Sequence, residues 1–205
     1  MDPKERILIK AHELYNRFGV RSVSMDDIAS SLGMSKKTVY QYYADKEELV
    51  REVFDLILDE NKSRCNRDIK ESENALHEIF LALDMMQEMF SKMNPVVLFD
   101  LQKYHPEVYQ KFHQHKNGFL YQVIKTNLEK GIKEELYRDD FDIDVIARFR
   151  IESIFIPFNS DVFPNNRTHL VHIEQQLADL FLCGIVTSKG LKLFHKYKKQ
   201  RTNNQ

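Results

Sequence analysis

Four consecutive residues, Ser35 to Thr38, carry side chains well suited to contact a polyanion. They begin a segment with helical apolar spacing, and the first turn of a helix presents free N–H groups and a positive dipole end to phosphate. Lys36 and Lys37 can donate to O6 and N7 of guanine, and Thr38 can bond a base edge or contact a thymine methyl group. The pattern predicts a helix, capped by Ser35, whose first turn meets bases in the major groove of DNA.

The residues that follow suit contacts to the DNA backbone. Gln41 lies one turn beyond the two lysines, faces the same way, and can reach an adenine or a phosphate. Tyr40 and Tyr42 are apolar rings that end in a hydroxyl donor for phosphate oxygens. Lys46 opens the next predicted helix beside them. The alternative is that the lysines are solvated and the tyrosines are structural, and for Tyr43 we expect a place in the core.

The elements that must position these side chains are two short helices that cross over a tight turn. Ala29 is small enough for the crossing, Gly33 tolerates the positive φ of the turn, and Val39 can pin the second helix from beneath. This spacing predicts a helix-turn-helix over about residues 25–44. An ordinary hairpin of two helices is the alternative that the spacing alone leaves open.

Apolar periodicity is helical almost throughout the rest of the chain, so the predicted fold class is all-α, with about nine helices in all. Four helices occupy roughly residues 4–60, and the polar stretch 61–73 either continues the fourth helix or forms a hinge. Proline, asparagine and acidic residues break the remainder into further segments. These predicted segments are 74–92, 95–103, 106–136, 142–158 and 168–187.

Composition and charge narrow the class of protein. The 205 residues are 42% hydrophobic and 30% charged, which excludes a disordered chain. Residues 1–46 hold 8 basic against 6 acidic side chains, and residues 189–205 hold 6 basic and none acidic, although the whole chain has a net charge of −1. A basic head and tail on an acidic body suggest a polyanion partner, and for the tail we favour a frayed, solvated end. Two cysteines, no membrane-length apolar run and no signal peptide lead us to expect a cytoplasmic protein.

The N-terminal segment closely resembles the DNA-binding domain of TetR/AcrR-type transcriptional regulators. The resemblance covers about 60 residues strongly and is architectural over the rest. It rests on the spacing of Ile28-Ala29, Gly33, Ser35, Val39-Tyr40, Tyr42-Tyr43, Lys46 and Leu49. It implies a DNA-binding domain over residues 1–62 and a helical ligand-binding and dimerisation domain over residues 63–205. The implied function is that of a dimeric regulator of transcription, expected to be a repressor, that binds a palindromic double-stranded operator.

The resemblance also implies roles for individual side chains. Lys36, Lys37 and Thr38 would read bases. Ser24, Tyr40, Tyr42 and Lys46 would hold the DNA backbone. Ser24 stands where threonine is commoner in the family, and Tyr43 where phenylalanine is commoner, and both differences are chemically mild.

Dimerisation in this family would pair the last two long helices, 142–158 and 168–187, with their symmetry mates in a four-helix bundle. A stripe on the second of these helices suits such a face. Its members are Leu170, Ile173, Leu177, Leu180, Phe181 and Gly184. Packing of this stripe inside its own subunit is the alternative.

Regulators of this type usually release DNA when a small molecule enters the C-terminal domain. Methionine and phenylalanine make an adaptable lining for hydrophobic ligands, and gap-filling core is the alternative for each of them. The candidate lining is Met85, Met86, Met89, Phe90, Met93, Tyr109, Phe112, His113, Phe155 and Phe158.

Enzymatic function is not expected, because the sequence carries no Gly-rich phosphate loop, HExxH, GxSxG or metal-spaced cysteine set. Neither a cofactor nor a metal is expected. A helical protein-interaction module that uses residues 24–46 to bind a partner other than DNA is the competing hypothesis.

Overall fold

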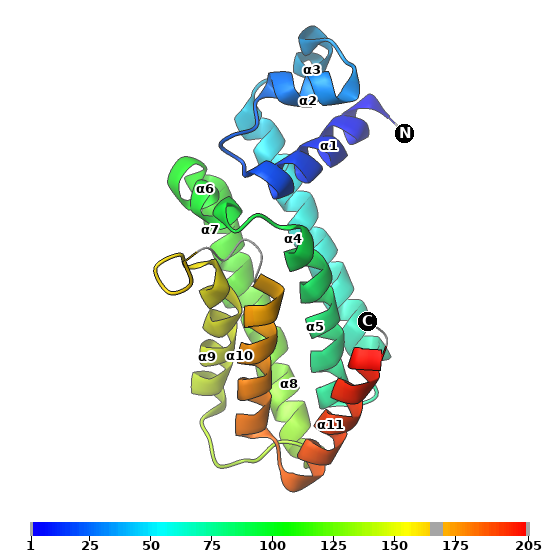
Figure 1. The fold of residues 1–205 in the computed structure, drawn as a ribbon, viewed down its shortest axis with the longest axis vertical. Helices are drawn as coiled ribbons and strands as arrows, with labels where there is room; N and C mark the ends of the chain where they lie inside the picture. The colour runs from blue at the N-terminus through cyan, green and yellow to red at the C-terminus, as the bar shows by residue number, and fades with distance from the viewer. Residues whose placement is uncertain (1, 165–169, 204–205) are drawn as a thin grey trace. The chain divides into compact units, whose positions relative to one another are not determined.

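The computed structural model describes residues 2–164 and 170–203 of the chain, and these residues are almost entirely helical (Figure 1). The helices are α1 (Pro3–Phe18), α2 (Met25–Leu32), α3 (Lys36–Tyr42), α4 (Lys46–Glu71), α5 (Ala75–Lys92), α6 (Val96–Tyr104), α7 (Pro106–His115), α8 (Tyr121–Lys133), α9 (Ile143–Phe155), α10 (Leu170–Ile185) and α11 (Ser188–Asn203). None of them has the length and apolar character that a bilayer-spanning segment needs.

Contacts within the chain divide it into two compact units. The first consists of Met1–Asn61 and Lys92–Gln114, and the second of Lys62–Ser91 and His115–Gln205. The first unit therefore contains α6 and α7 in addition to the N-terminal helices, an association that the sequence does not predict. The division falls within α4, whose residues 61–71 continue the helix rather than form a hinge.

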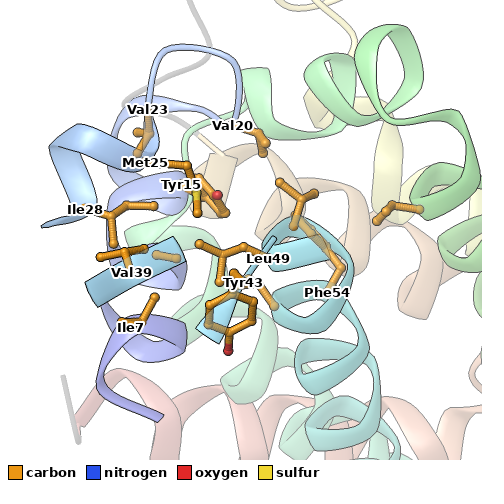
Figure 2. Packing of buried hydrophobic residues seen from close by; sticks show 14 of the residues in the cluster. Ile7, Tyr15, Val20, Val23, Met25, Ile28, Val39, Tyr43, Leu49 and Phe54 are labelled. Carbon is orange, nitrogen blue, oxygen red and sulfur yellow. The ribbon is translucent and has the colours of Figure 1, made fainter. Parts of the chain in front are cut away.

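The first unit is built around one hydrophobic core (Figure 2). Helices α1 to α4 and the segments between them contribute the buried side chains that Figure 2 labels: Ile7, Tyr15, Val20, Val23, Met25, Ile28, Val39, Tyr43, Leu49 and Phe54. Val97, Leu101 and Val108 from α6 and α7 complete the same cluster. Helix α3 is only seven residues long, so its orientation depends on Val39 and Tyr43, both fully buried.

Caps and a left-handed turn fix the two short helices. Ser24 and Asp27 form a capping box at the start of α2, each side chain bonding the backbone N–H of the other residue. Gly33 ends α2 with φ +64°, a conformation that an L side chain rarely adopts. Ser35 then caps α3 by accepting a hydrogen bond from the N–H of Thr38. The local signals in the sequence therefore set the turn between α2 and α3.

The second unit has its own core, and the basic tail is part of it. Residues 188–203 form helix α11, with Phe194 and Tyr197 buried against α5, so the prediction of a frayed, solvated end is wrong. The many charged residues make the tail look fully solvated in the sequence. Phe194 and Tyr197, however, are three residues apart and so lie on one face of a helix.

Two other segments differ from the predicted helices. The single helix predicted over 106–136 is α7 and α8, joined by five residues of π-helix, Lys116–Leu120. The last predicted segment, 168–187, corresponds to α10, and its first two residues lie outside the described residues.

Candidate functional site

The first turn of α3 is open to solvent. Lys36 and Lys37 are exposed, and Thr38 is partly exposed. The hydroxyl groups of Ser35 and Thr38 lie 2.8 Å apart, and Ser35 Oγ also accepts from the N–H of Thr38 at 3.1 Å. Ser35 therefore fixes the start of the helix and the rotamer of Thr38, while both lysines point away from the core.

Lys36 is held by a carboxylate of the preceding helix. Its Nζ lies 2.9 Å from Asp26 Oδ1, and the hydrogen bond to Asp26 raises the pKa of the lysine. The same Nζ stands 5.8 Å from the centre of the Tyr40 ring. Both partners of the ion pair are 59% exposed, so water and salt screen it and a phosphate can replace Asp26 at little cost.

The remaining residues of α3 separate into two faces. Tyr40, Gln41 and Tyr42 are exposed, whereas Tyr43 is buried and donates its hydroxyl to Glu52 at 3.3 Å. Figure 2 shows Val39 and Tyr43 directed into the core of the first unit. The expected core position of Tyr43 is confirmed, and the outer face keeps its polar tips free for a ligand.

Two candidate backbone contacts also have structural roles. Ser24 is exposed, and its hydroxyl donates to Asp27 Oδ2 at 2.6 Å; hydrogen bonds from Ser24 lower the pKa of Asp27. Lys46 is partly buried and donates to the carbonyl of Arg21 at 3.3 Å, and burial lowers the pKa of its ammonium group. Lys46 is thereby held beside the turn that leads into α2.

A cavity of about 90 Å³ lies in the second unit, several times the ~10–15 Å³ that one water molecule needs. Helices α4, α5, α8, α9 and α10 provide its walls. The lining is Cys65, Asp68, Ile69, Glu78, Ile79, Ala82, Met85, Met86, Val123, Ile124, Asn127, Leu128, Arg150, Ile154 and Phe181. Met85 and Met86 are the predicted lining residues among them.

The other predicted lining residues lie elsewhere. Phe90 and Phe158 pack edge to face in a separate cluster, with ring centres 5.0 Å apart. Phe155 contacts Lys116, and Met89 is 37% exposed. The rest belong to the first unit, where they pack on its core or on one another: Met93, Tyr109, Phe112 and His113. Met85, Met89 and Met93, spaced four residues apart, therefore do not form one wall of the cavity, because Met89 is exposed and Met93 lies in the first unit, which the chain enters after residue 91.

Most residues of the cavity wall cannot be identified as such from the sequence. Cys65, Asp68 and Ile69 belong to the polar stretch 61–73, and their approach to α8 and α9 depends on tertiary packing. A continuous helix through residue 71 places one apolar and two polar side chains of this stretch on the inner face. Recognising that α4 continues beyond residue 60 would have drawn attention to them.

An apolar surface remains on α9 and α10. On α10, Leu180 is 71% exposed, Gly184 is exposed with open space around it, and Ile173 and Leu177 are half-buried. On α9, Val145 and Phe149 are 60% and 55% exposed, and no pattern in the sequence marks them as surface residues.

The two other members of the predicted dimer stripe lie elsewhere. Leu170 and Phe181 are buried in the cores of their own chain. Fewer residues of α10 are therefore exposed than the sequence indicates. The exposed residues of α9 add to the apolar surface. Among the described residues, no group of three or more His, Cys, Asp or Glu side chains is placed to hold a metal ion.

Comparisons with known proteins agree with the helix-turn-helix. The family described as "Bacterial regulatory proteins, tetR family" matches residues 7–53, which contain most of α1, all of α2 and α3, and the start of α4. The uncharacterized HTH-type transcriptional regulator YvaF of Bacillus subtilis is 36% identical over 103 residues, 49% of this chain and 53% of that protein. The match thus spans about half of the length of YvaF.

Two further relatives match almost the whole chain. The HTH-type transcriptional repressor KstR2 of Mycobacterium tuberculosis is 24% identical over 90% of this chain and 93% of its own, and the structure of this ketosteroid transcriptional regulator superposes with a TM-score of 0.66. A regulator from Saccharomonospora viridis in complex with choline has a TM-score of 0.69 and 21% identity, over 90% of this chain and 97% of that one. These relatives are regulators and not enzymes. Residues 7–53 therefore match the DNA-binding domain of the tetR family of bacterial regulatory proteins, and the whole chain shares its fold with these regulators.

Proposed function

We propose that this protein is a homodimeric repressor that binds a palindromic operator through α3 and leaves it when a small molecule enters the cavity of the second unit. The observation that carries the proposal is the solvent-exposed first turn of α3, with Lys36 and Lys37 exposed on a helix whose opposite face is buried. A rigid helix with an open, cationic first turn suits the major groove.

The contacts to DNA divide by chemistry. Lys36, Lys37 and Thr38 lie on the solvent-exposed first turn of α3 and carry groups that can bond base edges, so we assign them to base reading. Ser24, Tyr40, Tyr42 and Lys46 flank them with hydroxyl and ammonium donors, which suit phosphate oxygens. We assign Ser35 to capping of the helix, and Gln41 to a base or a phosphate beside it.

Dimerisation is proposed through the exposed apolar surface of α9 and α10. Leu180 and Phe149 are too large and too exposed to be explained by the chain's own core, and the space around Gly184 admits a partner helix. Two copies related by a two-fold axis would present two α3 helices to successive major grooves, about 34–36 Å apart or somewhat more.

Ligand response is proposed from the cavity of about 90 Å³, which is mostly apolar and lined by side chains of five helices. The names of two relatives, a ketosteroid regulator and a regulator in complex with choline, concern those proteins, and they support the general idea that this fold holds small organic molecules. Linked binding of this kind is typically worth about 1–3 kcal/mol, or roughly 5–150-fold in operator affinity.

In-vitro selection from random duplexes, followed by fluorescence anisotropy, tests the proposal. We expect a palindromic sequence to be enriched and its affinity to fall steeply with salt. Lys46→Ala is expected to lower the salt slope by about one, whereas Lys133→Ala removes the same charge from an exposed position on α8 of the second unit and is expected to leave the slope unchanged. Enrichment of no sequence, with salt-insensitive binding, would favour the interaction-module hypothesis instead.

A further inference from the structure

The cavity of the second unit is apolar over most of its surface, so the few polar groups in its wall decide which ligand it admits. They are Asp68, Glu78, Asn127, Arg150 and the thiol of Cys65. A polar group that is already bonded to the protein has little to offer a ligand, whereas a buried charge with a weak partner gains most from a ligand of opposite charge.

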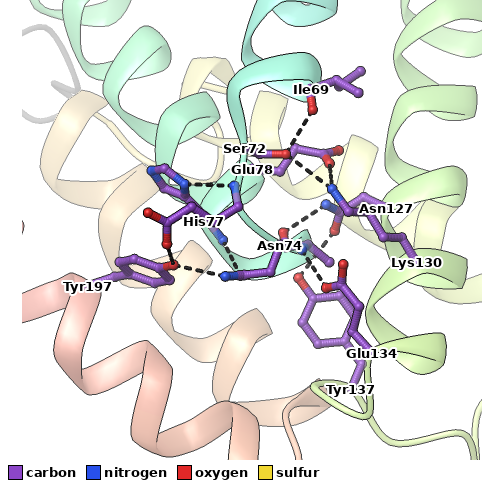
Figure 3. A network of polar contacts seen from close by, with 12 residues as sticks. Ile69, Ser72, Asn74, His77, Glu78, Asn127, Lys130, Glu134, Tyr137 and Tyr197 are labelled. Atoms are coloured by element: carbon purple, nitrogen blue, oxygen red, sulfur yellow. Dashed lines mark hydrogen bonds and ion pairs between the residues drawn. The ribbon is translucent and has the colours of Figure 1, made fainter.

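Two of these groups are committed to a polar network beside the cavity (Figure 3). Glu78 accepts a hydrogen bond from Lys130 at 3.1 Å, which neutralises its charge. Asn127 donates to the carbonyl of Ala75 at 2.9 Å and accepts from Tyr137 at 3.2 Å. Neither side chain has a charge left for a ligand.

Arg150 is also bonded to other groups of the protein. It donates to Glu174 Oε1 at 2.6 Å and to Ser153 Oγ at 3.2 Å, and its guanidinium stands 5.4 Å from the ring of Phe181. Arg150 and Glu174 are 4% and 3% exposed, so their charges compensate each other out of water. An anionic ligand that took Arg150 would leave Glu174 buried and unpaired, which is strongly unfavourable.

Asp68 differs from the other wall residues. It is 8% exposed, and its carboxylate is paired with Arg67 Nε at 3.5 Å, a side chain that is 59% exposed. An ion pair with so exposed a partner is screened by water and contributes little. The neighbouring thiol adds no second charge, because burial and the negative charge of Asp68 raise the pKa of Cys65 to about 11. The cavity wall thus carries one weakly compensated negative charge.

We propose that the ligand of this cavity is a small hydrophobic cation, an amine or quaternary ammonium compound whose charge is met by Asp68 and whose apolar part lies against Met86, Ile124 and Leu128. This inference rests on the proposed function, since it names the chemical class of the effector. The cavity volume of about 90 Å³ is below the ~150 Å³ that holds benzene, so a ligand of about ten non-hydrogen atoms requires the adaptable side chains of the wall to move.

Three ligands of one shape but different charge test the proposal: 3-phenylpropylammonium, 3-phenylpropan-1-ol and 3-phenylpropanoate. Their binding to the full-length protein is measured by calorimetry at neutral pH. We expect the ammonium compound to bind at least tenfold more tightly than the alcohol, and the carboxylate more weakly than both. Equal affinities, a preference for the carboxylate, or binding by none of the three would overturn the proposal.

Substitution of Asp68 tests whether its carboxylate causes the preference for the ammonium compound. Asp68→Asn is expected to reduce the preference for the ammonium compound over the alcohol to less than threefold, with alcohol binding unchanged. Glu71→Gln removes the same charge from an exposed position of the same helix and is expected to leave the tenfold preference intact. Thermal unfolding of both variants confirms that they are folded, and a preference that survives in folded Asp68→Asn contradicts the role of Asp68.

Operator binding in the presence of the same compounds separates this inference from the proposed function. If the ammonium compound binds in an Asp68-dependent way and also weakens operator binding, the cationic ligand class and ligand-driven release from the operator are both supported. If it binds in that way without any effect on the operator, the ligand class stands and ligand-driven release fails. If the alcohol or the carboxylate releases the operator instead, release stands and the cationic ligand class is overturned.

Discussion

The carboxylate of Asp100 accepts a hydrogen bond from the backbone N–H of Arg21 at 2.8 Å. This bond ties α6 to the turn between α1 and α2 within the first unit. The carbonyl of the same Arg21 accepts from Lys46, a predicted phosphate contact. One backbone residue thus connects α6 with a side chain that we assign to DNA binding, and a shift of α6 would be felt at Lys46.

Asp100→Ala is expected to destabilise the first unit by about 1–3 kcal/mol, because the substitution leaves the N–H of Arg21 without its buried acceptor. It is also expected to weaken operator binding several-fold in protein that is still folded, since Lys46 loses its fixed position. Urea unfolding and anisotropy measure the two effects. Unchanged operator affinity in the folded variant would show that α6 does not position Lys46.

Gly19→Ala is expected to be among the most damaging small substitutions in the first unit. Gly19 has φ +85°, and a Cβ there would lie 2.6 Å from Val96 Cγ1 and 2.9 Å from Asp100 Oδ2. Gly33→Ala is the matched control, because Gly33 also has positive φ, +64°, but open space around it. The control is expected to lose about 1–2 kcal/mol from backbone strain alone. Equal losses in urea unfolding would mean that α6 yields easily at Gly19.

Ser24→Ala is expected to lower stability at neutral pH by about 1 kcal/mol, because it removes the side-chain cap of α2. Hydrogen bonds from Ser24 lower the pKa of Asp27 in the folded protein. The stabilisation from Asp27 is therefore present above its ordinary pKa near 4 and is lost as pH falls through the lowered value. Ser24→Ala is expected to flatten that acid limb, and parallel pH profiles of the two proteins would contradict this account of the capping box.

Leu180→Lys is expected to convert the proposed dimer to a monomer, because it places a charge at the most exposed large apolar residue of the surface on α9 and α10. Leu191→Lys is the control, a substitution at a partly exposed leucine of α11, and it is expected to leave the dimer intact. Sedimentation equilibrium gives the mass directly. A dimer that persists in folded Leu180→Lys would place the interface elsewhere.

The local chemistry of the sequence accounts for the helix-turn-helix. Ser24 with Asp27, Gly33 and Ser35 are helix-start and helix-stop signals that act over a few residues, so their effect is readable without a fold. The same is true of the buried face of α3, since Val39 and Tyr43 lie one turn apart.

Features that depend on contacts between distant parts of the chain cannot be predicted from the sequence alone. The docking of α6 on the N-terminal helices rests on pairs such as Asp100 with Arg21, 79 residues apart, which no periodicity reveals. The cavity wall likewise combines the polar end of α4 with α8 and α9, and the burial of Asp68 follows from that meeting alone. The high charge of the basic tail predicts a solvated segment, whereas the burial of Phe194 and Tyr197, which holds it as a helix, depends on contacts with distant residues.

The central claim is that the first turn of α3 reads bases, and the base preference of Thr38→Ala tests it most directly. Operator sequences are selected from random duplexes in parallel with the wild-type protein and the variant, at the same salt concentration. The account predicts that preference relaxes at one position in each half-site, by about 1–3 kcal/mol, with the salt slope unchanged. Identical preferences at every position would contradict it and place the recognition surface outside this turn.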